Sequence, residues 1–343
     1  MYRRLFNFRV TAITAMAGMA LALSACGENE GSESGGQTDL AFATLDQGSA
    51  WYNYGISIGK VLEDDLPGNS LVEVLPYSGS IGNPELVSTG EAELATTFSS
   101  VARWAHTGQE GTPYEDEPLD NIRVLVGGID EYYFGPIASS SASFDSLDQA
   151  IEEEMPIDFV SQPRGSLGDA GTKMILEAYG TSEEDITSWG GSFDPTSTNV
   201  ASDAIQNEQA DLWIQAITAG HPNVTELAQA TDISILDISD EALENLSDFG
   251  LESAILPAGT FQGQDEEVQL PGFYTSVIAS EDMDEETAYA ITKSIVENAD
   301  QLKEENAGME AFDPDKAASE TLTGGVPLHP GAEKYFLEEG IID

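Results

Sequence analysis

A short loop, Gln162 to Gly168, contains the residues whose types and spacing best suit the binding of an anion. Gly165 and Gly168 would let a ligand approach the backbone closely, and the free N–H groups of a following helix carry a partial positive charge. Arg164 adds a cation to a chain that is otherwise strongly acidic. We therefore expect Gln162, Arg164, Gly165, Ser166 and Gly168 to bind the carboxylate of a small solute.

The alternative interpretation of this loop is an ordinary helix start. Ser166 or Asp169 would then cap the helix, and Arg164 would pair with one of the many nearby acids. The residues of the loop alone do not decide between the two interpretations.

The elements around the loop follow a pattern that repeats along the chain. An apolar run at 156–160 precedes it, and Met174, Leu176 and Tyr179 follow at helical spacing. Further strands are predicted at 40–45, 71–76, 94–98, 210–217, 233–238 and 269–280, with one long or bent strand over 122–129 and 132–138. Helices are predicted at 52–62, 83–89, 202–209, 224–230 and 287–306. This alternation predicts an α/β fold.

Small polar residues follow three of the predicted strands. Gly48-Ser49 comes after the first, Gly79-Ser80 after the second and Ser99-Ser100 after the third. The carboxyl ends of parallel strands share one edge of a sheet, and ligands bind at that edge in open α/β folds. Gly48, Ser49, Gly79, Ser80 and Ser100 are therefore candidate ligand-binding residues.

Four further candidates each have a structural alternative. Ser49 and Tyr52 would donate to a ligand carboxylate, or else cap and pack the first helix. Asn83 would contact the ligand, or else cap the helix that begins at Pro84. Tyr133 would line a cleft, although aromatic runs belong more often to the core. Gln215 alternates with Trp213 on a predicted strand, which favours a cleft position for the glutamine and a core position for the tryptophan.

The first 25 residues have the features of a secretory signal peptide. Arg3, Arg4 and Arg9 are followed by an apolar run at 10–23, which is shorter than the ~20 residues needed to cross a bilayer. The segment Leu23-Ser24-Ala25-Cys26 resembles a bacterial lipobox, which implies lipidation of Cys26 and a polar tether over 26–38. We expect a protein anchored by lipid to the cell membrane and facing the periplasm or the exterior.

The charge balance disfavours nucleic acid as a partner and suggests that the protein works at high salt concentration. The chain has 12 lysines and arginines against 62 acids, a net charge of −50. Such a surface disfavours nucleic acid, whose phosphates need a basic face, whereas 41% hydrophobic residues are enough for a core. Self-repulsion of this size is relieved by salt, so we predict a halophilic or halotolerant host. Cys26 is the only cysteine, and we expect no disulfide, metal or cofactor.

Motifs for enzymes are missing from the sequence. It has no Gly-x-Ser-x-Gly elbow and no His-Glu-x-x-His, and His106, His221 and His329 stand far apart beside turn residues. A pair of carboxylates means little among 62 acids. The sequence favours a binding protein, with a surface lipoprotein enzyme as an alternative.

Several segments together resemble the TAXI-family solute receptors of TRAP transporters. The matching segments, in order, are Gly48-Ser49-Ala50-Trp51-Tyr52-Asn53-Tyr54-Gly55, Gly79-Ser80-Ile81-Gly82-Asn83, Gly90-Glu91-Ala92-Glu93-Leu94-Ala95, the Gly165 loop, Gly220-His221-Pro222 and Leu328-His329-Pro330-Gly331-Ala332. The similarity runs from about Leu40 to the C-terminus.

The resemblance implies a two-domain, type II periplasmic-binding-protein fold that closes on its ligand by a hinge motion. The first domain would comprise residues 39–135 and 256–343, and the second residues 136–255. The implied ligand is a small anionic or zwitterionic solute, an amino acid such as glutamate or an organic acid. A monomeric receptor would deliver it to the membrane subunits of the transporter. An ABC-type binding lipoprotein and a ligand sensor for a membrane kinase are the alternatives.

The chain departs from the family pattern at some of the candidate positions. Leu167 and Gly168 stand where the family has a glycine and a threonine, so a hydroxyl donor is missing from the loop. Asn53 replaces a proline, Ala50 a threonine, and Ser100 a common aspartate. These changes imply a retuned specificity.

Overall fold

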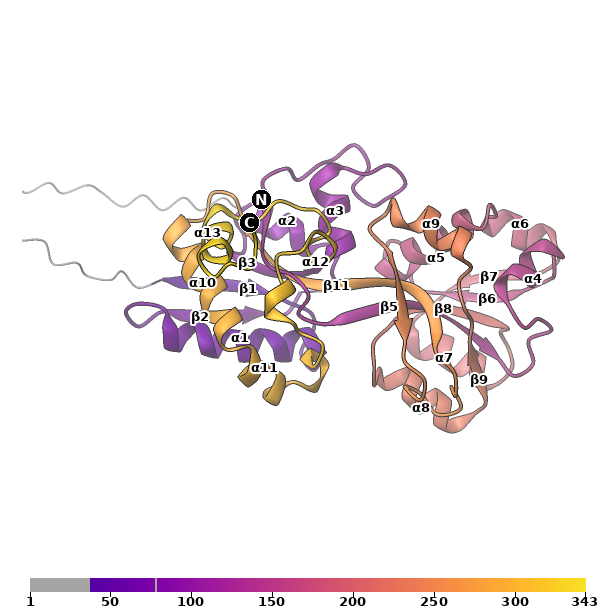
Figure 1. Cartoon of the computed structure of the whole chain (residues 1–343). Coiled ribbons are helices and arrows are strands. Elements are labelled where there is room, and N and C mark those ends of the chain that lie inside the picture. Colours follow the sequence, from indigo (N-terminus) through magenta and orange to yellow (C-terminus); the bar gives the residue numbers. More distant parts are fainter. Residues whose placement is uncertain (1–37, 78) are drawn as a thin grey trace, which may run out of the picture. The chain divides into compact units, whose positions relative to one another are not determined.

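The computed structural model describes residues 38–77 and 79–343 (Figure 1). The predicted signal peptide, the predicted lipidation site Cys26 and nearly all of the predicted tether lie outside these residues. In the described part, none of the helices is both long and apolar enough to cross a membrane.

Strands and helices alternate along the chain, which confirms the predicted α/β class. The strands are β1 (Asp39–Ala43), β2 (Leu71–Leu75), β3 (Leu94–Phe98), β4 (Ile122–Val126), β5 (Glu131–Ser139), β6 (Asp158–Ser161), β7 (Ser192–Pro195), β8 (Leu212–Ile217), β9 (Ile233–Ile235), β10 (Glu252–Leu256) and β11 (Val268–Ser280). The helices are α1 (Ala50–Asp65), α2 (Asn83–Ser88), α3 (Ser99–Thr107), α4 (Leu147–Glu152), α5 (Leu167–Ala178), α6 (Glu183–Ser188), α7 (Thr198–Gln206), α8 (Pro222–Ala230), α9 (Asp240–Ser247), α10 (Glu285–Glu297), α11 (Ala299–Glu305), α12 (Glu320–Thr323) and α13 (Pro330–Glu338).

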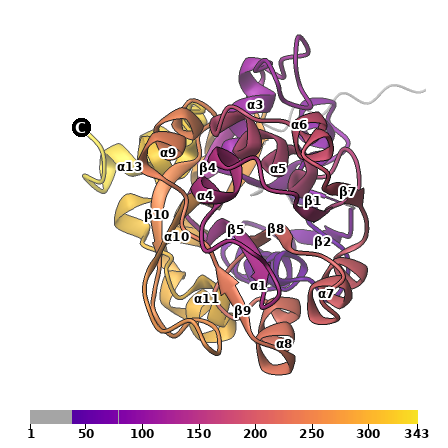
Figure 2. The ribbon, with the colours of Figure 1, turned by 90° about the vertical axis from the view of Figure 1, so that its right-hand side faces the viewer.

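The strands hydrogen-bond in the order β2-β1-β3-β11-β5-β8-β6-β7. The pairs β2–β1 and β1–β3 are parallel, and so are β8–β6 and β6–β7. Between these two parallel sets, β11 runs antiparallel to β3 and β5 (Figure 1). β5 in turn runs antiparallel to β8, which lies beside it in Figure 2. The sheet is therefore mixed, and its parallel strands lie at either end of the order.

The predicted long strand over 122–138 is in fact two strands. β4 pairs with β11 at Val277–Ser280, whereas β5 pairs with β11 at Gly272–Tyr274. The glycines at 127 and 128 separate them. A Cβ on Gly127 would lie 2.7 Å from the carbonyl carbon of Leu322, and Gly128 has a φ of 74°. The break is therefore caused by a close approach of α12.

The predicted helix over 287–306 was also too long, because α10 and α11 are separated at Asn298. The Asn298 side-chain amide donates to the carbonyl of Ser294 and to the carboxylate of Asp65, at 2.8 and 3.0 Å. This side chain thus joins the end of α10 to α1.

A row of aromatic side chains forms the core where β3, β11 and β5 meet. The Phe98 ring centroid lies 4.5 Å from that of Trp51 and 4.8 Å from that of Phe273, which lies 4.7 Å from Phe134. Among the acids of the described residues, only Asp130 and Asp169 are buried. The large excess of acids is thus a property of the surface.

Candidate functional site

The start of α1 holds Ser49 and Tyr52 in one turn. The Ser49 hydroxyl accepts a hydrogen bond from the Tyr52 backbone N–H at 3.1 Å, which is the contact expected of a helix cap. Gly48, just before it, has a φ of 92°, where glycine is favoured. Both Ser49 and Tyr52 are half-buried.

Asn83 ties the neighbouring strands together. Its side-chain amide donates to the Thr44 carbonyl at 3.1 Å and to the Thr96 carbonyl at 2.8 Å, which joins the end of β1 to β3. The alternative role of Asn83 as the cap of α2 is wrong, because Gly82 holds the cap position. The Asn83 Oδ1 atom is buried and has no partner within the described residues.

The serines that follow the second and third strands are buried. Ser80 is 5% exposed, and its carbonyl accepts a hydrogen bond from the Thr97 hydroxyl at 3.2 Å. Ser99 accepts a hydrogen bond from the Tyr274 N–H at 3.1 Å. The Ser100 hydroxyl finds no acceptor or donor in the described chain. Ser100 is the second residue of α3, and a Cβ on Gly250 would lie 3.6 Å from the Ser100 Cα. α3 therefore packs against the turn that follows α9.

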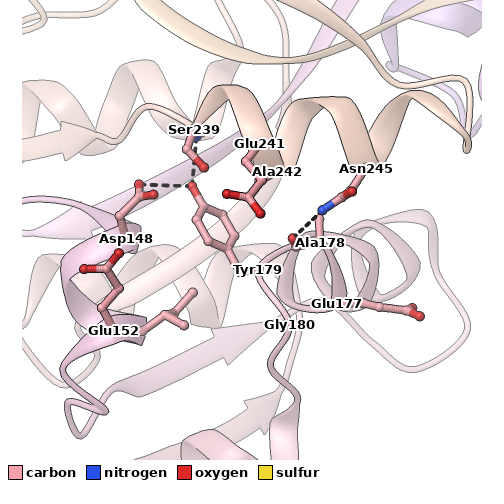
Figure 3. A pocket seen from close by; sticks show the side chains of 11 residues that line it. Asp148, Glu152, Glu177, Ala178, Tyr179, Gly180, Ser239, Glu241, Ala242 and Asn245 are labelled. Carbon is pink, nitrogen blue, oxygen red and sulfur yellow. Dashed lines mark hydrogen bonds between the residues drawn. The ribbon is translucent and has the colours of Figure 1, made fainter.

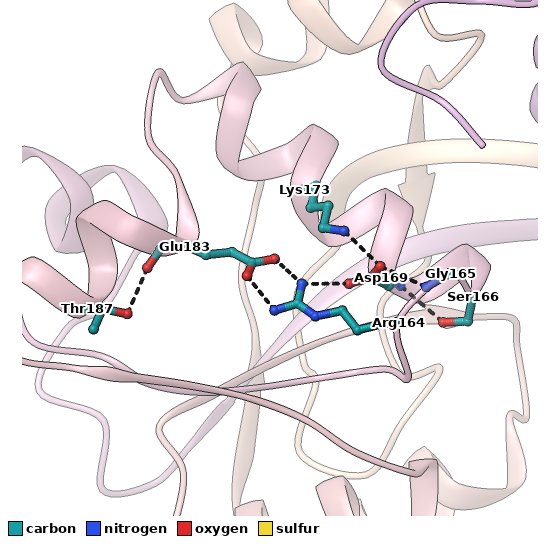
Figure 4. Close-up of polar contacts among 7 residues, drawn as sticks. All are labelled: Arg164, Gly165, Ser166, Asp169, Lys173, Glu183 and Thr187. Carbon is teal, nitrogen blue, oxygen red and sulfur yellow. Dashed lines mark hydrogen bonds and ion pairs between the residues drawn. The ribbon is translucent and has the colours of Figure 1, made fainter. Parts of the chain in front are cut away.

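The Gly165 loop places Arg164 among acids rather than leaving it free (Figure 4). Its guanidinium donates to both carboxylate oxygens of Glu183, one of them at 2.6 Å, and to Asp169 at 3.1 Å. Ser166 accepts a hydrogen bond from the Asp169 N–H at 3.3 Å. These are the contacts of the capping alternative.

Asp169 is the centre of this network. Its carboxylate also accepts from the Gly165 N–H at 3.0 Å and from the Lys173 ammonium at 2.9 Å. Burial raises the pKa of Asp169, but the Gly165 N–H, Lys173 and Arg164 together hold that pKa below its usual value. The carboxylate is thus ionised and occupies the anion-binding groups of the loop.

Gln162, at the end of β6, differs from Arg164 in having a free donor. The Gln162 side chain is 7% exposed, and its Oε1 atom accepts from the Thr198 hydroxyl of α7 at 3.1 Å. The Gln162 Nε2 atom has no acceptor among the described residues, and neither does the hydroxyl of the adjacent Ser161. Buried donors without an acceptor are unfavourable, and a ligand oxygen would satisfy them.

The remaining two candidates are buried in the β5–β8 region. Gln215 pairs in register with Gly135 of β5 and is 9% exposed. The Tyr133 hydroxyl donates to Glu131 at 2.7 Å, so it already has an acceptor. Trp213 is buried, as expected of a core residue.

Sequence reasoning missed Thr198, which anchors Gln162, and the buried acid Asp130. Neither Asp130 carboxylate oxygen has a hydrogen-bond partner at good geometry in the described chain, although the Tyr54 and Thr275 side chains lie beside it. An acid between two apolar runs was the available signal. For Thr198, whose hydroxyl contacts a residue 36 positions away, the sequence held no such signal.

Two surface hollows lie on the α5 side of the chain. One, of about 340 Å³, is lined by Asp148, Glu152, Glu177 and Glu241 around Tyr179, whose hydroxyl contacts Asp148 and Ser239 (Figure 3). The other, of about 440 Å³, is lined by Arg164, Lys173, Thr181 and Glu183 among others. The first is unsuited to an anion, and neither includes the candidates of the N-terminal strands.

Two parallel sets of strands joined by the antiparallel β5 and β11 define a periplasmic-binding-protein fold. The chain is similar to PhnD1 from Prochlorococcus marinus (MIT 9301) in complex with methylphosphonate, with 12% identity and a TM-score of 0.54 over 89% of this chain and 99% of that one. MatC (Rpa3494) from Rhodopseudomonas palustris with bound malate gives 12% identity and a TM-score of 0.53 over the same shares. A TctC solute-binding protein from Polaromonas gives 9% and 0.54 over 89% and 97%.

The chain belongs to the NMT1-like family, whose profile matches residues 42–340. This match covers the whole run of strands from within β1 to the end of α13. The predicted periplasmic-binding-protein fold is therefore confirmed.

Proposed function

We propose that this chain is the extracytoplasmic solute-binding subunit of a TAXI-type TRAP transporter. It would capture a small carboxylate, an amino acid such as glutamate or an organic acid, and deliver it to the membrane subunits. The observation that carries the proposal is the buried side-chain amide of Gln162, which has an N–H donor without an acceptor at the carboxyl end of a strand. Family membership and the TAXI-like segments support it.

The proposed binding mode needs two domains that move. We assign residues 39–135 and 256–343 to the first domain and residues 136–255 to the second. β11 hydrogen-bonds to β3 of one parallel set, β5 hydrogen-bonds to β8 of the other, and β11 and β5 pair with each other. These two strands therefore connect the two sets and are suited to act as hinge strands. The ligand would lie between the ends of β1, β2 and β3 on one side and the end of β6 on the other.

Neutral donors, rather than a free cation, would recognise the ligand. Gln162 and Ser161 offer unpartnered donors, and the first turn of α5 begins nearby at Leu167. Arg164 already pairs with Glu183 and Asp169, so we do not assign it a direct contact with the ligand. Ser49, Tyr52 and the Gly79-Ser80 segment would contribute from the opposite domain.

The anchoring of the receptor also belongs to this proposal. Cys26 would carry the lipid, a short tether would join it to β1, and the monomer would face the periplasm or the exterior. We propose binding without turnover, as in the solute-binding protein to which the chain is similar.

Ligand screening by thermal shift tests the function. The purified chain, in molar NaCl, would be heated with L-glutamate, other amino acids, malate, keto acids and methylphosphonate. A ligand at 100 times its Kd adds about 2.7 kcal/mol to folding stability and raises Tm accordingly. If no carboxylate raises Tm, the proposed substrate class is wrong. A neighbouring gene for an ATPase would instead favour the ABC-type alternative, and a neighbouring membrane kinase the sensor.

A further inference from the structure

The space above Gly168 is filled by the side chain of Gln162. A Cβ on Gly168 would lie 2.8 Å from the Gln162 Cβ and still closer to its Cγ, and real side chains do not approach so closely. Gly168 is the second residue of α5, and its φ is not in the left-handed region that favours glycine. Glycine is thus needed here for space and not for backbone conformation.

The Gln162 amide is held in one orientation. Thr198, the first residue of α7, donates its hydroxyl proton to Gln162 Oε1 at 3.1 Å. The amide Nε2 then carries two N–H groups that meet no acceptor in the described residues. Gln162 is only 7% exposed, so more than nine tenths of it is buried. A buried amide fixed at its oxygen and unsatisfied at its nitrogen is suited to receive an external oxygen atom.

A second observation at the same place points to a ligand. Ser161 is the last residue of β6, and its hydroxyl is fully buried and also lacks a partner within the described chain. Two adjacent residues thus each carry a donor without an acceptor, just before the loop that leads into α5. An unsatisfied group of this kind destabilises the empty protein, so its retention is best explained by an acceptor that arrives from outside.

We propose that Gln162 is a specificity-determining residue, and that Gly168 is kept without a side chain so that the Gln162 amide can donate to a carboxylate oxygen of the solute. This inference rests on the proposed function and extends it. The group bound at this position is a hydrogen-bond acceptor and needs no formal positive charge from the protein. An ammonium group would be excluded, because Nε2 offers only donors.

Binding measurements on matched variants test the role of the amide. Gln162→Ala removes the donor, and Gln162→Glu keeps the shape but presents a charged acceptor to the ligand carboxylate. With L-glutamate and malate as probes in calorimetry on the full chain, we expect Gln162→Ala to raise Kd by about 10- to 100-fold and Gln162→Glu by more. Gln206→Glu adds the same charge at an exposed site of α7 and should leave Kd unchanged.

The packing part of the inference has a readout that needs no ligand. We expect Gly168→Ala to lower Tm strongly in the wild-type background and much less in a Gln162→Gly background, where the facing side chain is gone. Equal losses in both backgrounds would overturn the packing argument. If wild-type protein binds a probe and both Gln162 variants bind it equally well, the inference fails while the proposed function stands. If wild-type protein binds neither these probes nor any other carboxylate, the proposed function itself fails.

Discussion

Arg164 and Glu183 are joined by two parallel hydrogen bonds, with Arg164 Nη2 at 2.6 Å from Glu183 Oε2. The guanidinium also lies over the Phe193 ring, 5.3 Å from its centroid. Arg164, the cation of the Gly165 loop, is thus engaged in a structural contact. We therefore propose that the neutral donors beside Arg164 take the anion-binding role that the sequence predicted for it.

Replacing Arg164 by alanine should leave ligand affinity within about twofold of the wild type. The Arg164 side chain is 48% exposed, and exposed ion pairs contribute only about 0–1 kcal/mol to folding stability. We expect a loss of stability of that size in urea unfolding, caused by the lost pair with Glu183 and the lost contact with Phe193. A tenfold loss of affinity for a carboxylate ligand, with Lys60→Ala unaffected, would show that Arg164 contacts the solute after all.

The buried Asp130 should make folding stability depend on pH. Burial raises the pKa of Asp130 from 3.8 to about 7, while the Thr275 and Tyr54 side chains lower it and Glu131 raises it slightly. A carboxyl group with a raised pKa binds more protons in the folded protein than in the unfolded chain. Its contribution is therefore fully present below about pH 4 and is lost as the pH rises towards 7.

Asp130→Asn should remove this pH dependence, since the amide stays neutral throughout. Between pH 4 and pH 8, the free energy of unfolding of Asp130→Asn should rise relative to that of the wild type, by at most about 4 kcal/mol. Tyr54 and Tyr132 face Asp130 and stay protonated over this range, because burial raises the pKa of both phenols. Urea unfolding at constant salt provides the measurement, with Asp300→Asn as the fully exposed control. Parallel pH profiles for Asp130→Asn and wild type would contradict the prediction.

The regular alternation of the chain was readable from the sequence, but contacts between distant residues were not. The units from β1 to β3 were predicted because each strand is followed by glycine or serine before a helical run. The separation of β4 from β5 depends on Leu322, and the break at Asn298 depends on Asp65. In both cases the residue responsible lies about 200 positions away in the sequence. A local pattern of apolar and polar residues cannot indicate a contact over that separation.

The candidate site shows the same division. The sequence indicated the loop, its glycines and Gln162, since these types stand at a strand end before a helix. It did not indicate that Gln162 fills the space over Gly168, or that Thr198 holds the amide. It also left open whether Arg164 is free or paired with an acid, because the count of arginines cannot show that Glu183 lies opposite.

Replacing Asn83 by alanine should destabilise the N-terminal strands. The Asn83 amide bridges the carbonyls of Thr44 and Thr96, and its removal leaves two buried carbonyls without these donors. With about 1–3 kcal/mol for each unsatisfied group, we expect a loss of about 2–4 kcal/mol in urea unfolding. The exposed Asn53→Ala serves as the control. A loss below about 0.5 kcal/mol would mean that Asn83 is free to serve the ligand instead.

Salt should stabilise the folded chain. The 62 acids far outnumber the 12 bases, and in the described residues nearly all of the acids are at the surface, so like charges repel across short distances. The screening length falls from about 10 Å at 0.1 M salt to about 3 Å at 1 M, which removes most of this repulsion. We therefore expect Tm to rise steeply between 0.1 and 1 M NaCl and more slowly above. A variant in which the exposed Asp64, Glu304, Glu310 and Glu339 are replaced by amides should start from a higher Tm and gain less from salt, because it has less charge to screen. A Tm that does not change with salt, or an equal gain in wild type and variant, would show that repulsion among surface acids is not what limits stability.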